Sequence, residues 1–412
     1  MTHVRNGLER AAAKMGRGLF FLYLNGASYR DDPTFWTSLL WNQGNPEEWA
    51  QAQSLDDDPL IRFASKKGVW ACADNILSFS KAQNGSLDVP GTRNMLTRFK
   101  AGFEGWQFQI RKVNREDVAL AIEMGVPQLS NWAKGKDKDK DNEIPAVSIG
   151  DTFWSRTLLG SLVGAGEYDE ETKDAIHTIA ECEKTTSEAW LFPIVAPRDY
   201  ASFLTEAQIP FHHLPGFFGA RPDEKEVSLM RSELALKSAR LVVMSSGMTE
   251  VWETIYREVG NLVEQAGTNI NFALLYLYPT RHNLCIIDQG ERRSVPQSAR
   301  LLPIYANADL GITRGGITVI EFIAAGLPFV VVQEPNHWLS QQQQSAVSQS
   351  QLGHSASLSL LQDHTKVLGL IARYLDATSQ NKKMKARQEF FEFGIEEKWA
   401  SLLLDSWARW HP

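Results

Sequence analysis

The chain has 412 residues, of which 43% are hydrophobic and 22% are charged, and its formal net charge is −7. This composition is typical of a globular protein long enough for two domains, and it excludes a disordered chain. The acidic balance argues against nucleic-acid binding, and no apolar run approaches the ~20 residues of a transmembrane helix. The only cysteines, Cys72, Cys182 and Cys285, form no CxxC pair. They predict a reducing, cytoplasmic location without a disulfide framework or a zinc site.

The first half of the chain alternates between helical and strand patterns, although the alternation is irregular. We expect a helix at residues 5–16 and strands at residues 19–25, 144–151 and 189–196. Residues 30–100 are rich in Trp, Asp and Asn and show no clear period, so we assign them no elements. The lysine–aspartate run at 134–143 is expected to be a solvated loop.

The second half alternates strictly, after a stretch that reads as a linker. The linker, "HHLPGFFGARPDEKE" at 212–226, has two prolines and two glycines. Beyond it we expect strands at 239–246, 272–279, 283–288, 309–313 and 328–332, and helices at 248–267 and 299–308. This alternation predicts α/β crossover units and a parallel sheet.

Residues 309–335, "DLGITRGGITVIEFIAAGLPFVVVQEP", hold a short apolar helix that carries Glu321. Thr318 and Glu321 have the spacing of a capping box at the helix start. A second interpretation is ligand binding, because α/β proteins bind ligands at the carboxyl ends of parallel strands. The helix start suits a phosphate, Gly315 and Gly316 permit close approach, and Glu321 is placed to accept hydrogen bonds from sugar hydroxyls. The two roles are compatible, so both interpretations stay open.

This stretch resembles the donor-binding core of GT-B glycosyltransferases, and most of all family 28 (MurG-like), whose enzyme adds GlcNAc to a lipid-linked muramyl-pentapeptide. The family pattern is ADL, then R-x-G-x-x-T-x-x-E-x-x-x-x-G-x-P, then H-x-x-x-Q-Q-x-x-x-A. The residues here that match it are Arg314, Gly316, Thr318, Glu321, Gly326, Pro328, His337, Gln341, Gln342 and Ala346. The resemblance implies that Glu321 binds the ribose hydroxyls of a nucleotide, that the glycine turn lies near the pyrophosphate, and that Gln341 and Gln342 face the donor sugar.

Further donor contacts are implied at less specific positions. His337 either contacts the donor or is an ordinary loop histidine. Ser246 and Gly247, in "VVMSSG", lie where the family has a glycine-serine phosphate turn. Arg221 lies where the family has an arginine near the diphosphate, and its alternative is a solvated linker arginine.

Two residues are candidates for the catalytic base. The opening "HVRNGLERA" resembles the family's G-H-V-x-x-G-L-x-x-A, which implies that His3 lies near the acceptor. A histidine at a chain start is otherwise part of a frayed terminus. Asp151 ends the expected strand at 144–151 and is the second candidate, with a helix N-cap as its alternative. The family's first strand is absent before His3, so we expect either a longer natural chain or a lost strand.

The resemblance implies the GT-B fold, with two doubly wound Rossmann-like α/β domains that face each other across a cleft. Residues 1–218 would bind the acceptor and residues 219–412 a nucleotide-sugar, and the amphipathic helix at about 396–412 would pack back on the first domain. The implied reaction is inverting transfer of GlcNAc or a similar hexose from a UDP-sugar to an acceptor hydroxyl. Backbone amides and Arg221 or Arg314 would stabilise the leaving diphosphate.

No metal or cofactor is expected in this reaction. The "DKD" at 137–139 has the D-x-D form of a metal site, but it lies within the lysine–aspartate run and lacks an apolar strand before it. The acceptor stays open among lipid-linked, protein and small-molecule hydroxyls.

Two alternatives remain. A non-hydrolysing UDP-GlcNAc 2-epimerase shares the fold and a similar glycine turn, but the tandem glutamines favour the transferase. A non-catalytic subunit that binds a nucleotide or a partner protein is the other alternative, because the first half of the chain departs from the family pattern.

Overall fold

In the computed structural model, the chain forms two compact units. The N-terminal unit comprises Met1–Ser80, Asp88–Gly219 and Phe393–Pro412, and the C-terminal unit comprises Lys81–Leu87 and Ala220–Glu392. The residues that the structure describes are 18–24, 68–74, 90, 92, 118–124, 128–134, 144–150, 154–164, 166, 168–192, 198–214, 224–245, 250–278, 283–295, 301–335, 338–349, 353–380, 401–402, 404–406 and 408–409.

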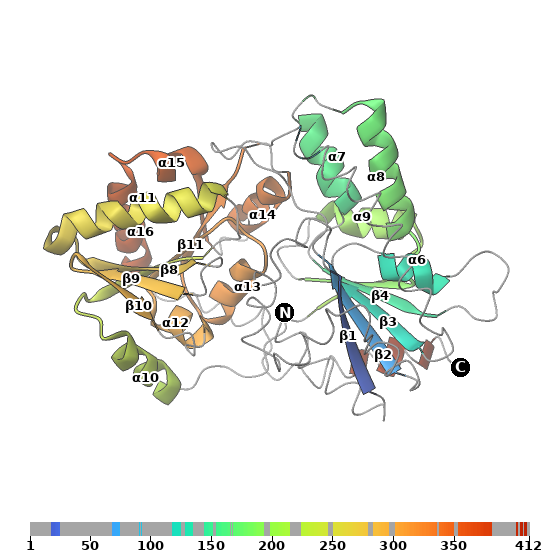
Figure 1. Cartoon of the computed structure of the whole chain (residues 1–412), viewed down its shortest axis with the longest axis horizontal. Helices are drawn as coiled ribbons and strands as arrows, with labels where there is room; N and C mark the ends of the chain where they lie inside the picture. The colour runs from blue at the N-terminus through green and yellow to red at the C-terminus, as the bar shows by residue number, and fades with distance from the viewer. Residues whose placement is uncertain are drawn as a thin grey trace, which may run out of the picture. The chain divides into compact units, whose positions relative to one another are not determined.

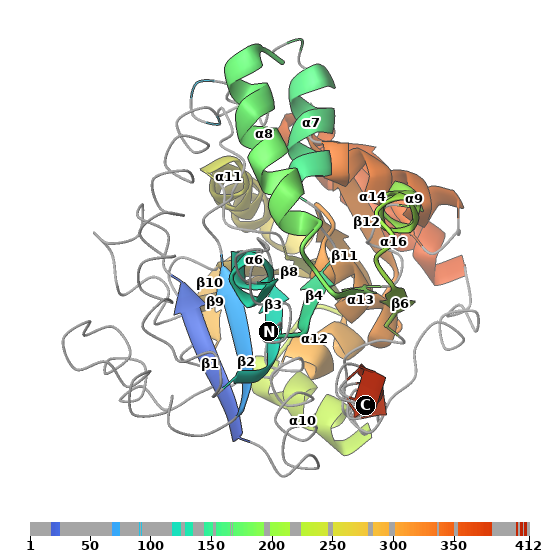
Figure 2. The same cartoon turned by 90° about the vertical axis from the view of Figure 1, so that its right-hand side faces the viewer.

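The N-terminal unit contains a parallel sheet of six strands that pair in chain order (Figures 1 and 2). The strands are β1 Gly18–Leu24, β2 Gly68–Asp74, β3 Val118–Met124, β4 Ala146–Gly150, β5 Glu188–Leu191 and β6 Phe211–His213. The expected strands near residues 19, 144 and 189 are confirmed, whereas β2 and β3 were not expected. β2 pairs directly with β3, so the described strands form an unbroken series.

Four helices of this unit are α6 Gln128–Lys134, α7 Trp154–Gly164, α8 Glu170–Glu183 and α9 Arg198–Glu206. α7 and α8 lie side by side (Figure 2). Asp169 and Thr172 form a capping box that starts α8. The buried Glu183 at the end of α8 accepts a hydrogen bond from the amide of Ser155 (3.2 Å) and one from its hydroxyl. Glu183 thereby supplies an acceptor for one of the first-turn amides of α7, which have no acceptor within the helix.

The C-terminal unit contains a seven-stranded sheet in the order β10-β9-β8-β7-β11-β12-β13. The strands are β7 Arg240–Met244, β8 Phe272–Tyr278, β9 Asn283–Asp288, β10 Glu291–Val295, β11 Leu310–Thr313, β12 Phe329–Gln333 and β13 His354–Ser357. The expectation of an entirely parallel sheet is wrong at one edge, because β9 and β10 run antiparallel to their neighbours. Only four residues separate β8 from β9, which is too short for a parallel crossover.

The described helices of this unit are α10 Glu224–Leu234, α11 Glu250–Ala266, η4 Gly267–Asn269, α12 Leu301–Asn307, α13 Ile317–Ala324, α14 Trp338–Gln349, α15 Leu358–Gln362 and α16 Val367–Gln380. The expected linker at 212–226 is shortened at both ends, because β6 and α10 extend into it. Among the described helices, none combines the length and apolarity that crossing a membrane requires.

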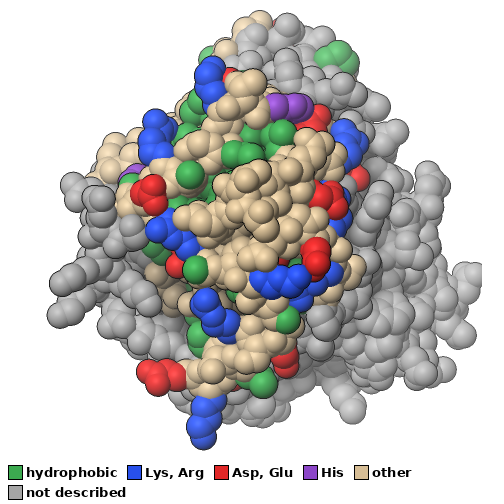
Figure 3. All heavy atoms as spheres, turned by 90° about the vertical axis from the view of Figure 1, so that its left-hand side faces the viewer, with side chains coloured by type: hydrophobic (Ala, Val, Ile, Leu, Met, Phe, Trp, Pro, Cys, Tyr) green, Lys and Arg blue, Asp and Glu red, His purple; other side chains and the backbone are tan. Residues whose placement is uncertain are grey.

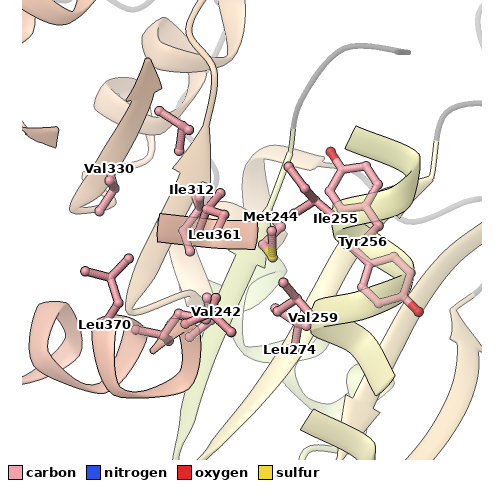
Figure 4. Packing of buried hydrophobic residues seen from close by; sticks show 14 of the residues in the cluster. Val242, Met244, Ile255, Tyr256, Val259, Leu274, Ile312, Val330, Leu361 and Leu370 are labelled. Carbon is pink, nitrogen blue, oxygen red and sulfur yellow. The ribbon is translucent and has the colours of Figure 1, made fainter. Parts of the chain in front are cut away.

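Helices cover both faces of the central strands. α11, α15 and α16 lie on one face, and α10 and α12 on the other (Figure 1). On the first face, Val242 and Met244 of β7 pack against Ile255 and Val259 of α11 in a continuous apolar cluster (Figure 4). This burial from both sides explains why β7, β11 and β12 are nearly continuous apolar runs. On the second face, α13 lies close against β11, where any side chain at Gly311 would collide with the ring of Phe322.

One exposed face of the C-terminal unit carries mixed charges, with blue and red side chains interspersed (Figure 3). Ion pairs on this unit include Arg240–Asp376 at 2.9 Å and Lys237–Glu291 at 2.6 Å. Exposed pairs of this kind contribute at most about 1 kcal/mol each, so they serve solubility more than folding.

The strand order of the C-terminal sheet reverses beside β7. The chain passes from β7 to β8 on one side and later returns to β11 on the other. Ile312 of β11 is in register with Met244 of β7, and the amide of Ser245 donates to the carbonyl of Ile312 (2.9 Å). The carboxyl ends of β7 and β11 therefore lie next to each other at a topological switch point, where α/β sheets bind their ligands.

Candidate functional site

The turn after β11 has a backbone that favours glycine at two successive positions. Gly315 has φ 125° and Gly316 has φ 70°, both in the region that side-chain-bearing residues rarely adopt. Gly316 is the N-cap of α13. The capping-box interpretation is therefore wrong, because Thr318 lies inside the helix and Glu321 is its fifth residue instead of a first-turn acid. Gly316 can begin the helix without a capping side chain because its left-handed backbone makes the turn.

Two buried side chains hold this turn. The amide of Gly315 donates to Thr313 Oγ1 (3.2 Å), and the amide of Gly316 donates to Gln343 Oε1 (2.7 Å). Thr313 is fully buried and Gln343 is 2% exposed. A side chain at Gly315 would overlap Gln343 Oε1, so this position requires glycine for space as well as for its backbone angle. Neither Thr313 nor Gln343 was predicted from the sequence to take part in the site.

The first turn of α13 offers backbone amides to an anion. The amides of Ile317 and Thr318 follow the N-cap and therefore have no acceptor within the helix. Such amides, together with the positive end of the helix dipole, favour a phosphate group. Arg314, which lies between β11 and the glycine turn, is partly exposed and adds a positive charge to the same corner of the sheet.

Glu321 lies one turn further along α13. Burial raises the pKa of Glu321 to about 7, although the residue keeps partial exposure. Burial, and then the charge of Glu321, raise the pKa of the buried Tyr305 of α12 well above its usual range. The hydroxyl of Tyr305 donates to Ser245 Oγ (3.3 Å), and its ring meets Phe322 edge-on with centroids 4.9 Å apart. This contact chain connects the carboxyl end of β7 with the helix that carries Glu321.

α14, which follows β12, contacts the glycine turn through Gln343. The fully buried Glu334 follows β12 and accepts a hydrogen bond from Trp252 Nε1 of α11 (2.9 Å). Its amide donates to Ser340 Oγ in the first turn of α14 (3.3 Å). Gln341 and Gln342 are half-buried on α14, whereas the next residue, Gln343, is buried against the glycine turn.

The predicted site residues fall into two groups. The structure brings Arg314, Gly315, Gly316, Thr318 and Glu321 together at one strand end and connects them to the helix of Gln341 and Gln342 through Gln343. The other candidates, namely His3, Asp151, Arg221, Ser246, Gly247 and His337, lie outside the described residues, as does the D-x-D stretch at 137–139. Their assigned roles stay predictions.

The sequence does contain a signal for the burial of Gln343. Ser340, Gln343 and Val347 are the buried residues of α14, and their i, i+3, i+7 spacing marks one helix face. Within the described residues, no group of three or more His, Cys, Asp or Glu side chains is arranged to hold a metal ion.

Residues 289–397 match the glycosyltransferase family 28 C-terminal domain. This part of the chain is therefore similar to the C-terminal domain of family 28 glycosyltransferases. The predicted resemblance is thereby confirmed over the glycine turn, Glu321 and α14 of this domain. No curated protein sequence matches the chain.

Two solved glycosyltransferases have a similar structure over nearly the whole chain. The calicheamicin glycosyltransferase CalG4 has a TM-score of 0.51 at 13% identity, covering 96% of this chain and 99% of the other. Phytolacca americana UGT2, complexed with UDP-2fluoro-glucose and pterostilbene, has a TM-score of 0.51 at 9% identity, covering 95% and 99%. At these identities the likeness shows the fold, so the predicted GT-B fold is confirmed. The family 28 domain and this fold together support the prediction of a glycosyltransferase.

Proposed function

We propose that this protein is a glycosyltransferase that moves a sugar from a UDP-sugar to an acceptor hydroxyl. The observation that carries the proposal is the corner formed by β11, α13 and α14 within the family 28 domain. There, a glycine turn, two first-turn amides and a carboxylate of raised pKa lie at the switch point of a doubly wound sheet.

In the proposed donor complex, the residues of this corner divide the nucleotide-sugar between them. Glu321 accepts hydrogen bonds from the ribose hydroxyls, which restores polar contacts to a carboxylate that burial has desolvated. The amides of Ile317 and Thr318 and the guanidinium of Arg314 bind the diphosphate. Gln341 and Gln342 hydrogen-bond to the hydroxyls of the donor sugar, for which GlcNAc or a similar hexose is proposed.

The proposed chemistry is a single displacement with inversion. A base, His3 or Asp151, takes the proton of the acceptor hydroxyl while its oxygen attacks the anomeric carbon. The bond from that carbon to the diphosphate oxygen breaks, and UDP leaves with the electron pair. Backbone amides with Arg314 and Arg221 stabilise the negative charge that develops on the diphosphate, so no metal is assigned a step.

The proposal is tested by thermal denaturation with UDP, GDP, ADP and their sugar conjugates. A ligand at a hundred times its dissociation constant adds about 2.7 kcal/mol to the free energy of unfolding. We expect UDP compounds to stabilise the wild type and Glu233→Ala, which removes an exposed glutamate of α10, but not Glu321→Ala. If no nucleotide stabilises the wild type, the proposed function is wrong.

A further inference from the structure

Gln343 binds the backbone of the glycine turn from a different helix. Its side chain is 2% exposed, and its Oε1 accepts the Gly316 amide at 2.7 Å. The side chain lies so close to Gly315 that it fills the space a Cβ would occupy. The family pattern assigns the donor sugar to Gln341 and Gln342, so it leaves this third glutamine without a role.

The glycine turn needs such a contact because its backbone is costly to hold. The two successive glycines, both at positive φ, lose more conformational entropy on folding than other residues do. Thr313 Oγ1 accepts from the Gly315 amide (3.2 Å) and donates to the Gly315 carbonyl (3.3 Å), so it contacts both peptides that flank Gly315. Gln343 adds a hydrogen bond to the amide of the Gly315–Gly316 peptide and so links the turn to α14.

The chemistry of the Gln343 contact determines what the turn presents to a ligand. The glutamine satisfies the Gly316 amide with a neutral acceptor and leaves the next two amides, those of Ile317 and Thr318, at the helix start. A neutral acceptor is required there, because a carboxylate in its place would repel a phosphate bound to the neighbouring amides.

We infer that Gln343 is a positioning residue for the donor diphosphate. By holding the Gly316 peptide, it orients the first turn of α13 so that its amides converge on the phosphates. The inference rests on the proposed function and deepens it. It requires that Gln343 contributes to the binding of the diphosphate and not to the binding of the nucleoside.

The test compares uridine with UDP by isothermal titration calorimetry on the full chain. Gln343→Met keeps the length of the side chain and removes the acceptor, and Gln349→Met makes the same change at an exposed position of the same helix. We expect Gln343→Met to weaken UDP about tenfold and uridine less than twofold, since one buried hydrogen bond is lost. Gln349→Met should change neither affinity. Equal losses for uridine and UDP, or no loss for either, would overturn the inference.

A second variant keeps the test decisive if the methionine variant does not fold. Gln343→Glu retains an acceptor for the Gly316 amide but adds a negative charge beside the phosphates. UDP should then weaken by more than tenfold while uridine binding is retained, and an equal loss of both would again overturn the inference. If the wild type binds neither uridine nor UDP, the proposed function itself is wrong. If the wild type binds both and the variant loses the two affinities equally, only the role of Gln343 is wrong.

Discussion

The two units each hold a carboxylate at their sheet, and the surroundings of the two groups differ. In the N-terminal unit, Glu188 at the start of β5 is 1% exposed, and its carboxylate accepts several hydrogen bonds from the protein. It accepts hydrogen bonds from Trp190 Nε1 (2.8 Å), Ser406 Oγ (2.6 Å) and Arg409 Nη2 (2.8 Å), and His212 Nε2 lies 3.0 Å away. In this way Glu188 joins the helical residues near the chain end to β5.

Glu321 in the C-terminal unit is in the opposite situation. Burial raises its pKa to about 7, which marks a carboxylate whose charge is poorly solvated. A carboxylate with many protein donors contributes to the fold, whereas one that is desolvated at a ligand-binding edge is suited to accept hydrogen bonds from a ligand. The comparison predicts that Glu188 serves stability and that Glu321 serves binding.

The largest expected effect is on folding, from Glu188→Ala. The change leaves the indole N–H of Trp190 and the guanidinium of Arg409 without their shared acceptor. We expect the free energy of unfolding in urea to fall by about 3 kcal/mol, because the buried Trp190 and Ser406 lose this acceptor. Glu170→Ala is the matched control, because Glu170 has a side chain that is 87% exposed and forms an exposed ion pair with Lys173. Its effect should stay within about 0.5 kcal/mol.

Unfolding in urea also distinguishes the role of Glu188 from that of Glu321. Glu321→Gln should leave the free protein at least as stable as the wild type at about pH 8, because it removes a charge that burial disfavours. A loss similar to that of Glu188→Ala would show that both carboxylates are structural, and the comparison would then be wrong.

A smaller effect is expected from Gly315→Ala, beside Glu321. Alanine at φ 125° is strained, and its Cβ would overlap Gln343 Oε1. We expect a loss of about 2 kcal/mol in the free energy of unfolding, together with a loss of UDP binding that exceeds the loss for uridine. Gly166→Ala, at φ 74° in open space in the other unit, is the control for backbone strain alone. Equal destabilisation by the two changes would mean that the contact with Gln343 has no importance for the turn.

The donor corner could be predicted from the sequence because its residues are close together in the chain. The strand, glycine turn and helix that place Arg314, Gly316 and Glu321 all lie within residues 309–335. What the sequence could not show is which side chains reach the turn from elsewhere. The spacing of Ser340, Gln343 and Val347 marks the buried face of α14, but it does not identify the partner of Gln343, which lies 27 positions away at Gly316.

The parts of the fold that were missed have similar physical causes. β10, with the sequence "ERRSV", has mostly exposed side chains because it is an antiparallel edge strand, so it lacks the apolar run that identifies a buried parallel strand. Glu188 looks like an ordinary polar strand residue, since its donors Ser406 and Arg409 lie more than 200 positions away. Contacts of this kind follow from the tertiary fold and leave no periodic pattern.

The smallest expected effect is a pH dependence, and it probes Glu321 most directly. Uridine has ribose hydroxyls and no group that titrates between about pH 6 and pH 8, so any change in its affinity comes from the protein. If the ionised carboxylate accepts the ribose hydroxyls, protonation below its pKa of about 7 removes that acceptor. Uridine should therefore bind about tenfold more weakly at about pH 6 than at about pH 8.

The sign of this effect is opposite to that of the same group on folding. The pKa of Glu321 is raised above its ordinary value of 4.5, so the folded state holds the proton more tightly than the unfolded state. Its contribution to stability is complete below pH 4.5 and is lost as the pH rises through 7. Ligand binding needs the ionised form of Glu321, which folding disfavours, and in this Glu321 differs from Glu188.

Calorimetric titration of Glu321→Gln with uridine should show an affinity that does not change with pH. A pH dependence equal to that of the wild type would assign the titration to another group.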